Sequence, residues 1–258
     1  MTVSATHLVL IPSYNTGARL LDTVTAALAF WAPVWVVVDG STDGSHEAVQ
    51  RLAERDTRGR VIIRDANGGK GAAVLTGVRE ARAQNFSHVL TMDSDGQHPV
   101  DHIPQFMAAS QRHPNALVLG RPVFGPEVPL ERLHGRKLSV GLAHLEILGA
   151  GIDDPLFGSR VYPAEPLQAA LESTRRARGF DFDPEVAVRM VWAGVPTVNL
   201  AAPCRYLSKQ EGGVSHFHYV RDNLKLIWLH TRLLTQVILW RWPLILRRRR
   251  TVKAGQPT

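Results

Sequence analysis

Two aspartates separated by one residue, Asp93 and Asp95, follow an apolar run with the composition of a β-strand at residues 87–92. A buried carboxylate is costly without a positively charged partner. Mg²⁺ and Mn²⁺ suit such a pair, because hard cations prefer carboxylate oxygens together with the oxygens of a diphosphate. The alternative is a plain turn, since Gly96 follows Asp95 and Asp-Gly is a frequent turn pair. The stretch therefore predicts either a metal–diphosphate site or a turn.

The elements around this stretch alternate in type, with strand-like apolar runs at 7–11, 34–38 and 60–64. Helical patterns at 18–30, 45–55 and 70–84 separate these runs and the strand before Asp93. This alternation is typical of an α/β fold with a parallel sheet flanked by helices. Polar loops at 12–16, 39–44, 67–71 and 93–98 each follow a strand. Ligands of open α/β sheets bind beyond the carboxyl ends of the strands, so the four loops predict one site.

Beyond residue 100 the pattern is less regular. Helices are expected at 103–112, 130–148 and 184–193, and strands at 116–119, 159–162 and 196–200. The loop at 151–158 carries two further acidic residues, Asp153 and Asp154.

The loop at 67–71 is rich in glycine and precedes a helix. Its backbone can approach a phosphate closely, and Lys70 can add positive charge. The spacing is not that of a Walker loop, and residues 40–44 do not supply GxGxxG, which disfavours a dinucleotide enzyme. Asp39, at the end of the second strand, either accepts hydrogen bonds from a base or ribose or caps a helix.

The composition is that of an ordinary globular protein. The chain has 258 residues, 45% hydrophobic and 21% charged, which fits about one large domain. A single cysteine, Cys204, excludes an internal disulfide framework and fits a reducing compartment. Because the first residues lack the layout of a signal peptide, a cytoplasmic location is expected.

The positive charge is concentrated at the C-terminal end. Residues 205–258 hold eleven Lys and Arg against two acidic residues, a net +9, so residues 1–204 carry −2 of the total +7. We therefore separate a globular domain at 1–204 from a basic C-terminal region at 205–258. A nucleic-acid-binding fold would carry its basic residues on the fold itself, so no nucleic-acid partner is expected.

Within this basic region, residues 219–242 read as an amphipathic helix that Pro243 ends. The apolar run 233–240 is too short to span a bilayer. Trp228, Trp240 and Trp242, together with the arginines at 247–250, suit a helix lying on an anionic membrane surface at the inner face of the cell membrane. The alternative is a terminal helix packed on the fold.

Four motifs, at residues 11–15, 37–44, 69–71 and 93–98, resemble in order and spacing those of family 2 glycosyltransferases with the Rossmann-like GT-A fold. The resemblance covers about residues 5–200 and is nearest to the polyprenyl-phosphate (dolichyl-phosphate-type) mannosyl- and glucosyltransferases. Two positions depart from the family pattern. Val38-Asp39 stands where the family commonly has two aspartates, and Asn15 stands where Glu or Asp is usual.

The resemblance implies a role for each matching residue. The nucleotide-sugar would be held by Pro12, Tyr14, Asn15, Asp39, Ser41, Lys70, Asp93 and Ser94. Asp95 and Gln97 would bind Mg²⁺ or Mn²⁺ at the diphosphate. Arg121 would face the transferred sugar or an acceptor phosphate, and the acceptor side would include Asp154, Ser159 and Arg160. Residues 211–217 would form a loop over the donor.

Inverting transfer to a hydroxyl needs a carboxylate base near the acceptor. Asp183 is our candidate, and its alternative role is the N-cap of the following helix. A phosphate acceptor is already ionised and needs no base.

The predicted function is metal-dependent, inverting sugar transfer from a UDP- or GDP-linked donor to a lipid, lipid-phosphate or other membrane-associated acceptor. Two alternatives remain open. A nucleotidyltransferase would release pyrophosphate, although its usual glycine- and arginine-rich N-terminal loop is missing here. A non-catalytic nucleotide-sugar-binding protein would bind the donor without transferring it.

Overall fold

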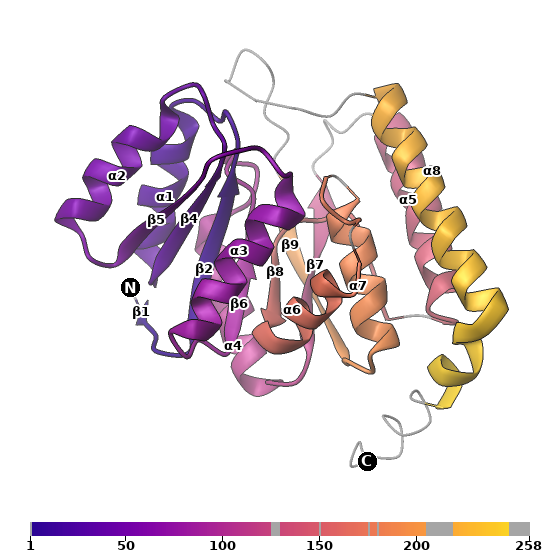
Figure 1. The fold of residues 1–258 in the computed structure, drawn as a ribbon. Coiled ribbons are helices and arrows are strands. Elements are labelled where there is room, and N and C mark those ends of the chain that lie inside the picture. Colours follow the sequence, from indigo (N-terminus) through magenta and orange to yellow (C-terminus); the bar gives the residue numbers. More distant parts are fainter. Residues whose placement is uncertain are drawn as a thin grey trace.

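The computed structural model describes residues 2–124, 130–149, 151–174, 176–179, 181–204 and 219–247. A seven-stranded sheet, in the order β5-β4-β2-β6-β8-β7-β9, forms its centre (Figure 1). The strands are β2 (His7–Ser13), β4 (Val34–Asp39), β5 (Gly59–Arg64), β6 (His88–Thr91), β7 (Leu117–Phe124), β8 (Arg160–Pro163) and β9 (Thr197–Cys204). All run parallel except β8, which is antiparallel to both of its neighbours. The predicted mostly parallel α/β sheet is confirmed.

Helices cover both faces of this sheet (Figure 1). They are α1 (Arg19–Phe30), α2 (Ser45–Arg55), α3 (Lys70–Ala83), α4 (Ile103–Arg112), α5 (Leu130–Glu146), α6 (Ala164–Glu172), α7 (Phe182–Trp192) and α8 (Tyr219–Gln236). A short 3₁₀ turn, η1 (Val100–His102), precedes α4, and β1 (Thr2–Val3) pairs with β3 (Trp31–Ala32) beside the main sheet. The sequence did not predict α6.

The central strands β2, β4, β6 and β8 are buried along their whole length, and most of their residues are apolar, as expected where both faces of a sheet are covered. Alternate side chains of β2 point to opposite faces. Leu8 and Leu10 belong to the cluster that includes residues of α3, α6 and α7, whereas Val9 and Ile11 belong to the cluster that includes residues of α1 and α4. The helices packed on the two faces of the sheet hold the carboxyl ends of the strands in fixed relative positions.

The strands β7 and β9 continue past their predicted ends at 119 and 200. They pair with each other in parallel as far as Phe124 and Cys204. The sequence Arg121-Pro122 interrupts the apolar pattern, and the pairing with a distant strand overrides that local signal. Arg121 consequently lies on a strand rather than on a free loop.

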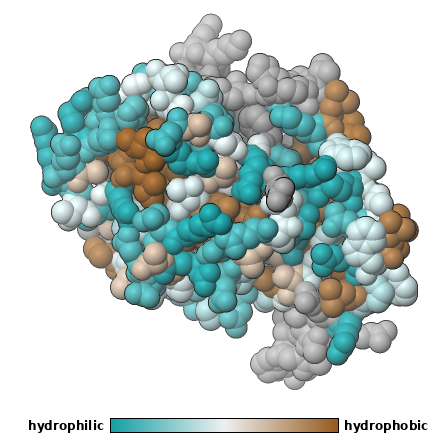
Figure 2. Space-filling view, in the orientation of Figure 1, coloured by the Kyte–Doolittle hydropathy of each residue, from teal (hydrophilic) through white to brown (hydrophobic). Residues whose placement is uncertain are grey.

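The C-terminal helix packs on the fold with one face. Leu229, Leu233 and Val237 are buried in the core cluster that also contains Ala143 of α5. The opposite face is exposed and carries large apolar residues, which are Leu224, Ile227, Trp228, Ile238, Leu239, Trp240 and Trp242. Figure 2 shows hydrophobic side chains at the edge of the molecule that α8 forms in Figure 1. Within the described residues, no helix is both long enough and apolar enough to cross a bilayer.

The prediction that Pro243 ends this helix is wrong. A π-helical turn at Val237–Arg241 follows α8, and residues 242–247 are again helical. A proline inside a helix lacks an N–H donor, and its ring clashes with the carbonyl four residues earlier. A π turn changes the hydrogen-bonding register just before the proline, so the chain stays helical around the ring.

The start of α3 packs against the backbone that precedes α7. The Gly71 amide donates to the carbonyl of Arg178 (3.1 Å), and a Cβ on Gly71 would overlap the carbonyl oxygen of Ala177. Gly69 has φ +86°, and a Cβ there would overlap the carbonyl of Arg178. These glycines are therefore required by the close approach of two chain segments.

Substituting Gly71→Ala is expected to destabilise the protein by about 1–3 kcal/mol, because the new methyl group forces the two segments apart. Gly141→Ala is the matched control. Gly141 is a helical glycine with open space at its Cβ position, and there alanine should stabilise by about 0.5–1 kcal/mol. Urea denaturation measures both free energies of unfolding. Equal effects of the two substitutions would contradict the packing account.

Candidate active site

Hydrogen bonds join three of the four predicted loops at the carboxyl edge of the sheet. The amide of Asn15 donates to Ser41 Oγ (3.1 Å), and the amide of Thr42 donates to Asn15 Oδ1 (2.8 Å). The hydroxyls of Thr16 and Ser94 lie 2.8 Å apart. Asn15 has φ 46°, a left-handed conformation that asparagine tolerates. The loop after β2 is thus fastened to the loops after β4 and β6.

Asp39 joins the glycine-rich loop to the same edge. Its carboxylate is almost fully buried and accepts the amides of Gly68 (3.1 Å) and Gly69 (2.7 Å). Arg64 Nη1 lies 3.4 Å from Asp39 Oδ1. Asp39 therefore organises the loop before α3. Of the other residues expected on the donor side, Pro12 is buried in β2 and Tyr14 is exposed.

The centre of the site is an ammonium between two carboxylates. Lys70 Nζ lies 2.7 Å from Asp93 Oδ1 and 2.6 Å from Asp183 Oδ2. Burial alone would lower the pKa of Lys70, but the charges of Asp183 and Asp93 outweigh it and raise that pKa above its ordinary value. Burial likewise opposes ionisation of Asp93. Its contacts with Lys70 and with His98 Nε2 (3.0 Å) nevertheless bring its pKa below the ordinary value.

Asp183 does not cap α7. The helix begins at Phe182, Asp181 occupies the N-cap position, and the Asp183 carboxylate turns toward Lys70. Asp183 Oδ1 is buried and has no hydrogen-bond partner among the described residues. Asp183 Oδ2 is thus occupied by the ammonium of Lys70, and a role of Asp183 as a general base stays a prediction.

The stretch with Asp95 forms a turn next to Asp93. Asp95 Oδ1 accepts the amide of Gln97 (3.0 Å), and Gly96 has φ 75°. Burial and the neighbouring charge of Asp93 raise the pKa of Asp95. Within the described residues, no group of three His, Cys, Asp or Glu side chains stands ready to hold a metal. A cation here would consequently need oxygens from a ligand.

The predicted acceptor residues lie on β7, in the loop before β8 and at the first residue of β8. Arg121 is exposed, and its Nε is 3.9 Å from Asp153 Oδ2. Asp154 is buried and accepts Arg136 Nη1 of α5 (2.6 Å) and the amide of Leu156 (2.8 Å). Ser159 is buried as well. The structure places two arginines, Arg121 and Arg136, next to these acidic residues.

The expectation that Arg160 lines the acceptor side is corrected. Its side chain is fully buried, and Nε, Nη1 and Nη2 donate to the carbonyls of Phe157, Asp183 and Pro155 at 2.8, 2.5 and 2.6 Å. All three nitrogens bind backbone oxygens, so Arg160 braces the loop before β8 against α7. The sequence could not show this, because two of these carbonyls belong to a loop and the third to a helix far along the chain.

The sequence argument also left two side chains without a role. His98 belongs to the motif that contains Asp93, but the sequence did not indicate that the His98 imidazole bonds to Asp93 Oδ2. Arg136 lies on α5, and only the packing of that helix brings it to Asp154. No local pattern could have identified Arg136.

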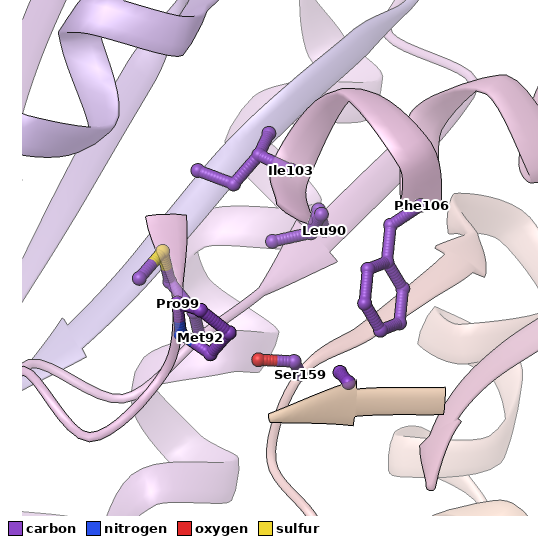
Figure 3. Close-up of a pocket in the computed structure, with 7 residues that line it drawn as sticks. Leu90, Met92, Pro99, Ile103, Phe106 and Ser159 are labelled. Atoms are coloured by element: carbon purple, nitrogen blue, oxygen red, sulfur yellow. The ribbon is translucent and has the colours of Figure 1, made fainter. Parts of the chain in front are cut away.

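A small hollow behind the loop at 93–98 is not a ligand site (Figure 3). Its lining residues are Leu90, Met92, Pro99, Ile103, Phe106, Ser159 and Ala202. All except Ser159 are apolar, so the hollow has no charged side chain to pair with a phosphate. It is part of the packing that supports the loop from the side of α4.

Substituting Lys70→Met should destabilise the protein by about 1–3 kcal/mol at pH 7, because it leaves two partly buried carboxylates without their partner. The folded-state pKa of Asp93 lies below its ordinary value, so this pairing adds stability above that ordinary pKa, about 4, and loses it as the pH falls. The difference between wild type and variant should therefore shrink below pH 4. Urea titrations at several pH values measure it, with Lys225→Met as an exposed control.

The family and the fold are both recognisable by comparison. A sequence model of the family "Glycosyl transferase family 2" matches residues 8–160. The chain is 27% identical to a dolichol-phosphate mannosyltransferase of Mycosarcoma maydis, over 84% of this chain and 78% of that protein. It is 28% identical to a polyprenol monophosphomannose synthase of Mycolicibacterium smegmatis, over 80% of this chain and 78% of that protein.

Solved structures agree on the fold. Glucosyl-3-phosphoglycerate synthase from Mycobacterium tuberculosis, in complex with Mn²⁺ and UDP-glucose, superposes with a TM-score of 0.60 at 18% identity, covering 92% of this chain and 79% of that one. A mannosyltransferase from Pyrobaculum calidifontis, in complex with GDP-mannose and Mn²⁺, gives 0.60 at 16%, covering 98% and 76%. The family model spans more than half of the residues, and the sheet agrees with the GT-A fold; the chain belongs to glycosyl transferase family 2 and is a glycosyltransferase.

Proposed function

We propose that the protein transfers a sugar from a nucleoside-diphosphate sugar to the phosphate of a polyprenyl-type lipid at a membrane surface. The observation that carries this proposal is the position of Asp93. It follows β6, which lies in the sheet between the donor-side strands β2 and β4 and the strands β8 and β7, and it contacts Lys70 of the Lys70–Asp183 pair. Arg121 lies on β7, and Arg136 of α5 bonds to Asp154 in the loop before β8. Such a site can hold a diphosphate on one side and receive an anionic acceptor on the other.

The donor side supplies the groups that a nucleotide needs. In this proposal the nucleoside lies over the loop with Tyr14, Asn15 and Ser41, where polar side chains already fix the backbone. The ribose and diphosphate extend toward Asp93 and Ser94. The nucleotide is UDP- or GDP-linked, as in the complexes of the two similar structures.

A divalent cation fits the donor set. Asp93 and Asp95 are near enough that the charge of one raises the pKa of the other, and a cation between them relieves that repulsion. We propose that Asp95 and Gln97, with Asp93 beside them, hold Mg²⁺ or Mn²⁺, and that diphosphate oxygens complete the coordination. The bound cation would stabilise the negative charge that develops on the leaving diphosphate.

The acceptor side suits an anion that needs no activation. In the proposed reaction an oxygen of the lipid phosphate bonds to the anomeric carbon while the bond from that carbon to the diphosphate oxygen breaks, which inverts the configuration. Arg121 and Arg136 orient the phosphate, since guanidinium groups recognise phosphate oxygens in a planar, bidentate manner. Asp154 holds Arg136 in place. Asp183 then acts by fixing Lys70, and it would serve as a base only for a hydroxyl acceptor.

The exposed face of α8 supports a peripheral position at the inner face of the cell membrane. Leu224, Ile227 and Trp228 on this face are exposed, and the hydroxyls of Thr231 and Thr235 donate to backbone carbonyls four residues earlier. Threonines that satisfy their hydroxyls in this way lower the cost of placing the face against lipid. The basic residues of the C-terminal region add attraction to anionic lipid.

Replacing Asp95 by alanine should lower sugar transfer by at least about 10²-fold, because the charge on the leaving diphosphate loses its stabilisation. Asp101→Ala, which removes an exposed carboxylate a few residues along the chain, should keep wild-type activity. The assay follows labelled sugar into a polyprenyl phosphate from UDP- and GDP-sugars, with and without Mn²⁺. Full activity of the Asp95 variant would refute the proposed cation site.

Introducing charge on the exposed face of α8, as Ile227→Glu, should weaken binding to vesicles containing anionic phospholipid by at least about tenfold. Ile63→Glu places the same charge on an exposed apolar residue of β5 and should bind like the wild type. Sedimentation with vesicles measures the bound fraction. Equal binding of all three proteins would exclude α8 as the membrane contact.

A further inference from the structure

Arg232 of α8 reaches across to a fully buried carboxylate on α7. Arg232 Nη2 lies 2.5 Å from Glu185 Oε2, and Arg189 Nε lies 2.8 Å from Glu185 Oε1. Glu185 has no exposed surface. Two guanidinium groups thus share one carboxylate, one from the same helix and one from the C-terminal helix. The second links α8 to the beginning of α7.

That beginning of α7 is the part that enters the active site. Asp183 and Glu185 lie in the same first turn. The carboxylate of Asp183 bonds to Lys70, and its backbone oxygen accepts Arg160 Nη1 (2.5 Å). Asp183 Oδ1 has no hydrogen-bond partner within the described part of the chain. The position of the Asp183 carboxylate, and with it the position of Lys70 beside Asp93, therefore depends on where the first turn of α7 lies.

A second contact of α8 is directed elsewhere. His230 Nδ1 lies 2.7 Å from Glu146 Oε1 of α5, and both side chains are buried. His230 therefore fastens α8 to α5, while Arg232, two residues on, fastens it to α7. The two contacts are made by different side chains, so each can be substituted on its own. The charge of Arg232 also acts on Glu146, and comparing the two variants distinguishes the attachment of α8 from its effect on α7.

We propose that Arg232 and Glu185 are positioning residues for sugar transfer. Their ion pair fixes the first turn of α7, and through Asp183 it fixes the ammonium of Lys70 beside Asp93. The proposal rests on the proposed function and extends it, because it makes the C-terminal helix part of the active-site framework as well as a membrane contact. A displacement of about 1 Å at reacting groups can lower a rate by about 10²-fold.

The stability of the Arg232→Met variant depends on which groups remain around Glu185. Removing one partner of a buried ion pair is strongly destabilising when the other charge is left uncompensated. In Arg232→Met the carboxylate of Glu185 keeps Arg189 as its partner. The variant should consequently fold, and its defect should appear in turnover.

The test compares variants in detergent solution, where membrane attachment is not required. The substrates are GDP-mannose or UDP-glucose, whichever the wild type uses, and a short polyprenyl phosphate. Arg232→Met should lower kcat by at least about tenfold with KM for the donor within about twofold. Arg232→Lys, which keeps one charged donor, should recover most of the lost kcat. His230→Gln, the matched control, should keep kcat within about twofold.

Two results would overturn the proposal. The first is an Arg232→Met enzyme with wild-type kcat. The second is an equal loss in Arg232→Met and His230→Gln, which would show that any loosening of α8 is sufficient. Hydrogen exchange gives a readout that does not depend on activity. Amides of residues 182–186 should exchange faster in Arg232→Met than in wild type or His230→Gln, and unchanged exchange contradicts the inference even if the wild type transfers neither sugar. Such an inactive wild type would instead count against the proposed function.

Discussion

The site depends on the ammonium of Lys70 between Asp93 and Asp183. Three elements that are distant in sequence, the start of α3, the end of β6 and the start of α7, meet at this one cation. Charges at this depth are tolerated only when they are paired at short distance. The close packing of Gly71 on the chain before α7 brings the helices near enough for that pairing. The glycines beside Lys70 therefore serve helix packing, and the approach of this loop to a phosphate stays a prediction.

The sequence predicts the donor half of the fold well because its signals are local. Strands β2, β4, β5 and β6 are short, mainly apolar runs, each followed by a polar loop, so the order and location of these loops could be predicted without coordinates. The strands in the second half of the chain are harder to predict from the sequence. Strand β7 extends through Arg121 and Pro122 only because β9 pairs with it, and β9 comes much later in the sequence.

Side-chain partners were the least predictable feature. Arg160 was expected at the acceptor side. All three nitrogens of its guanidinium instead donate to backbone carbonyls that only the fold brings together. Arg136 and His98 acquire their roles from Asp154 and Asp93 in the same way. For α8 the sequence posed a choice between packing and membrane contact. The helix buries one face and exposes apolar residues on the other, so the two options are compatible.

The balance of charge at the site bears on what it can bind. Asp93, Asp95 and Asp183 bring three carboxylates, and Lys70 brings one ammonium. Lys70 bonds to Asp93 and Asp183 but not to Asp95, whose pKa is raised by burial and by the charge of Asp93. Asp95 is thus the carboxylate of the cluster whose negative charge is least compensated. A divalent cation there would neutralise the excess and attract the negatively charged diphosphate, whereas a second lysine could only complete a closed ion-pair network. The incomplete pairing of Asp95 is what makes the cluster suited to a ligand.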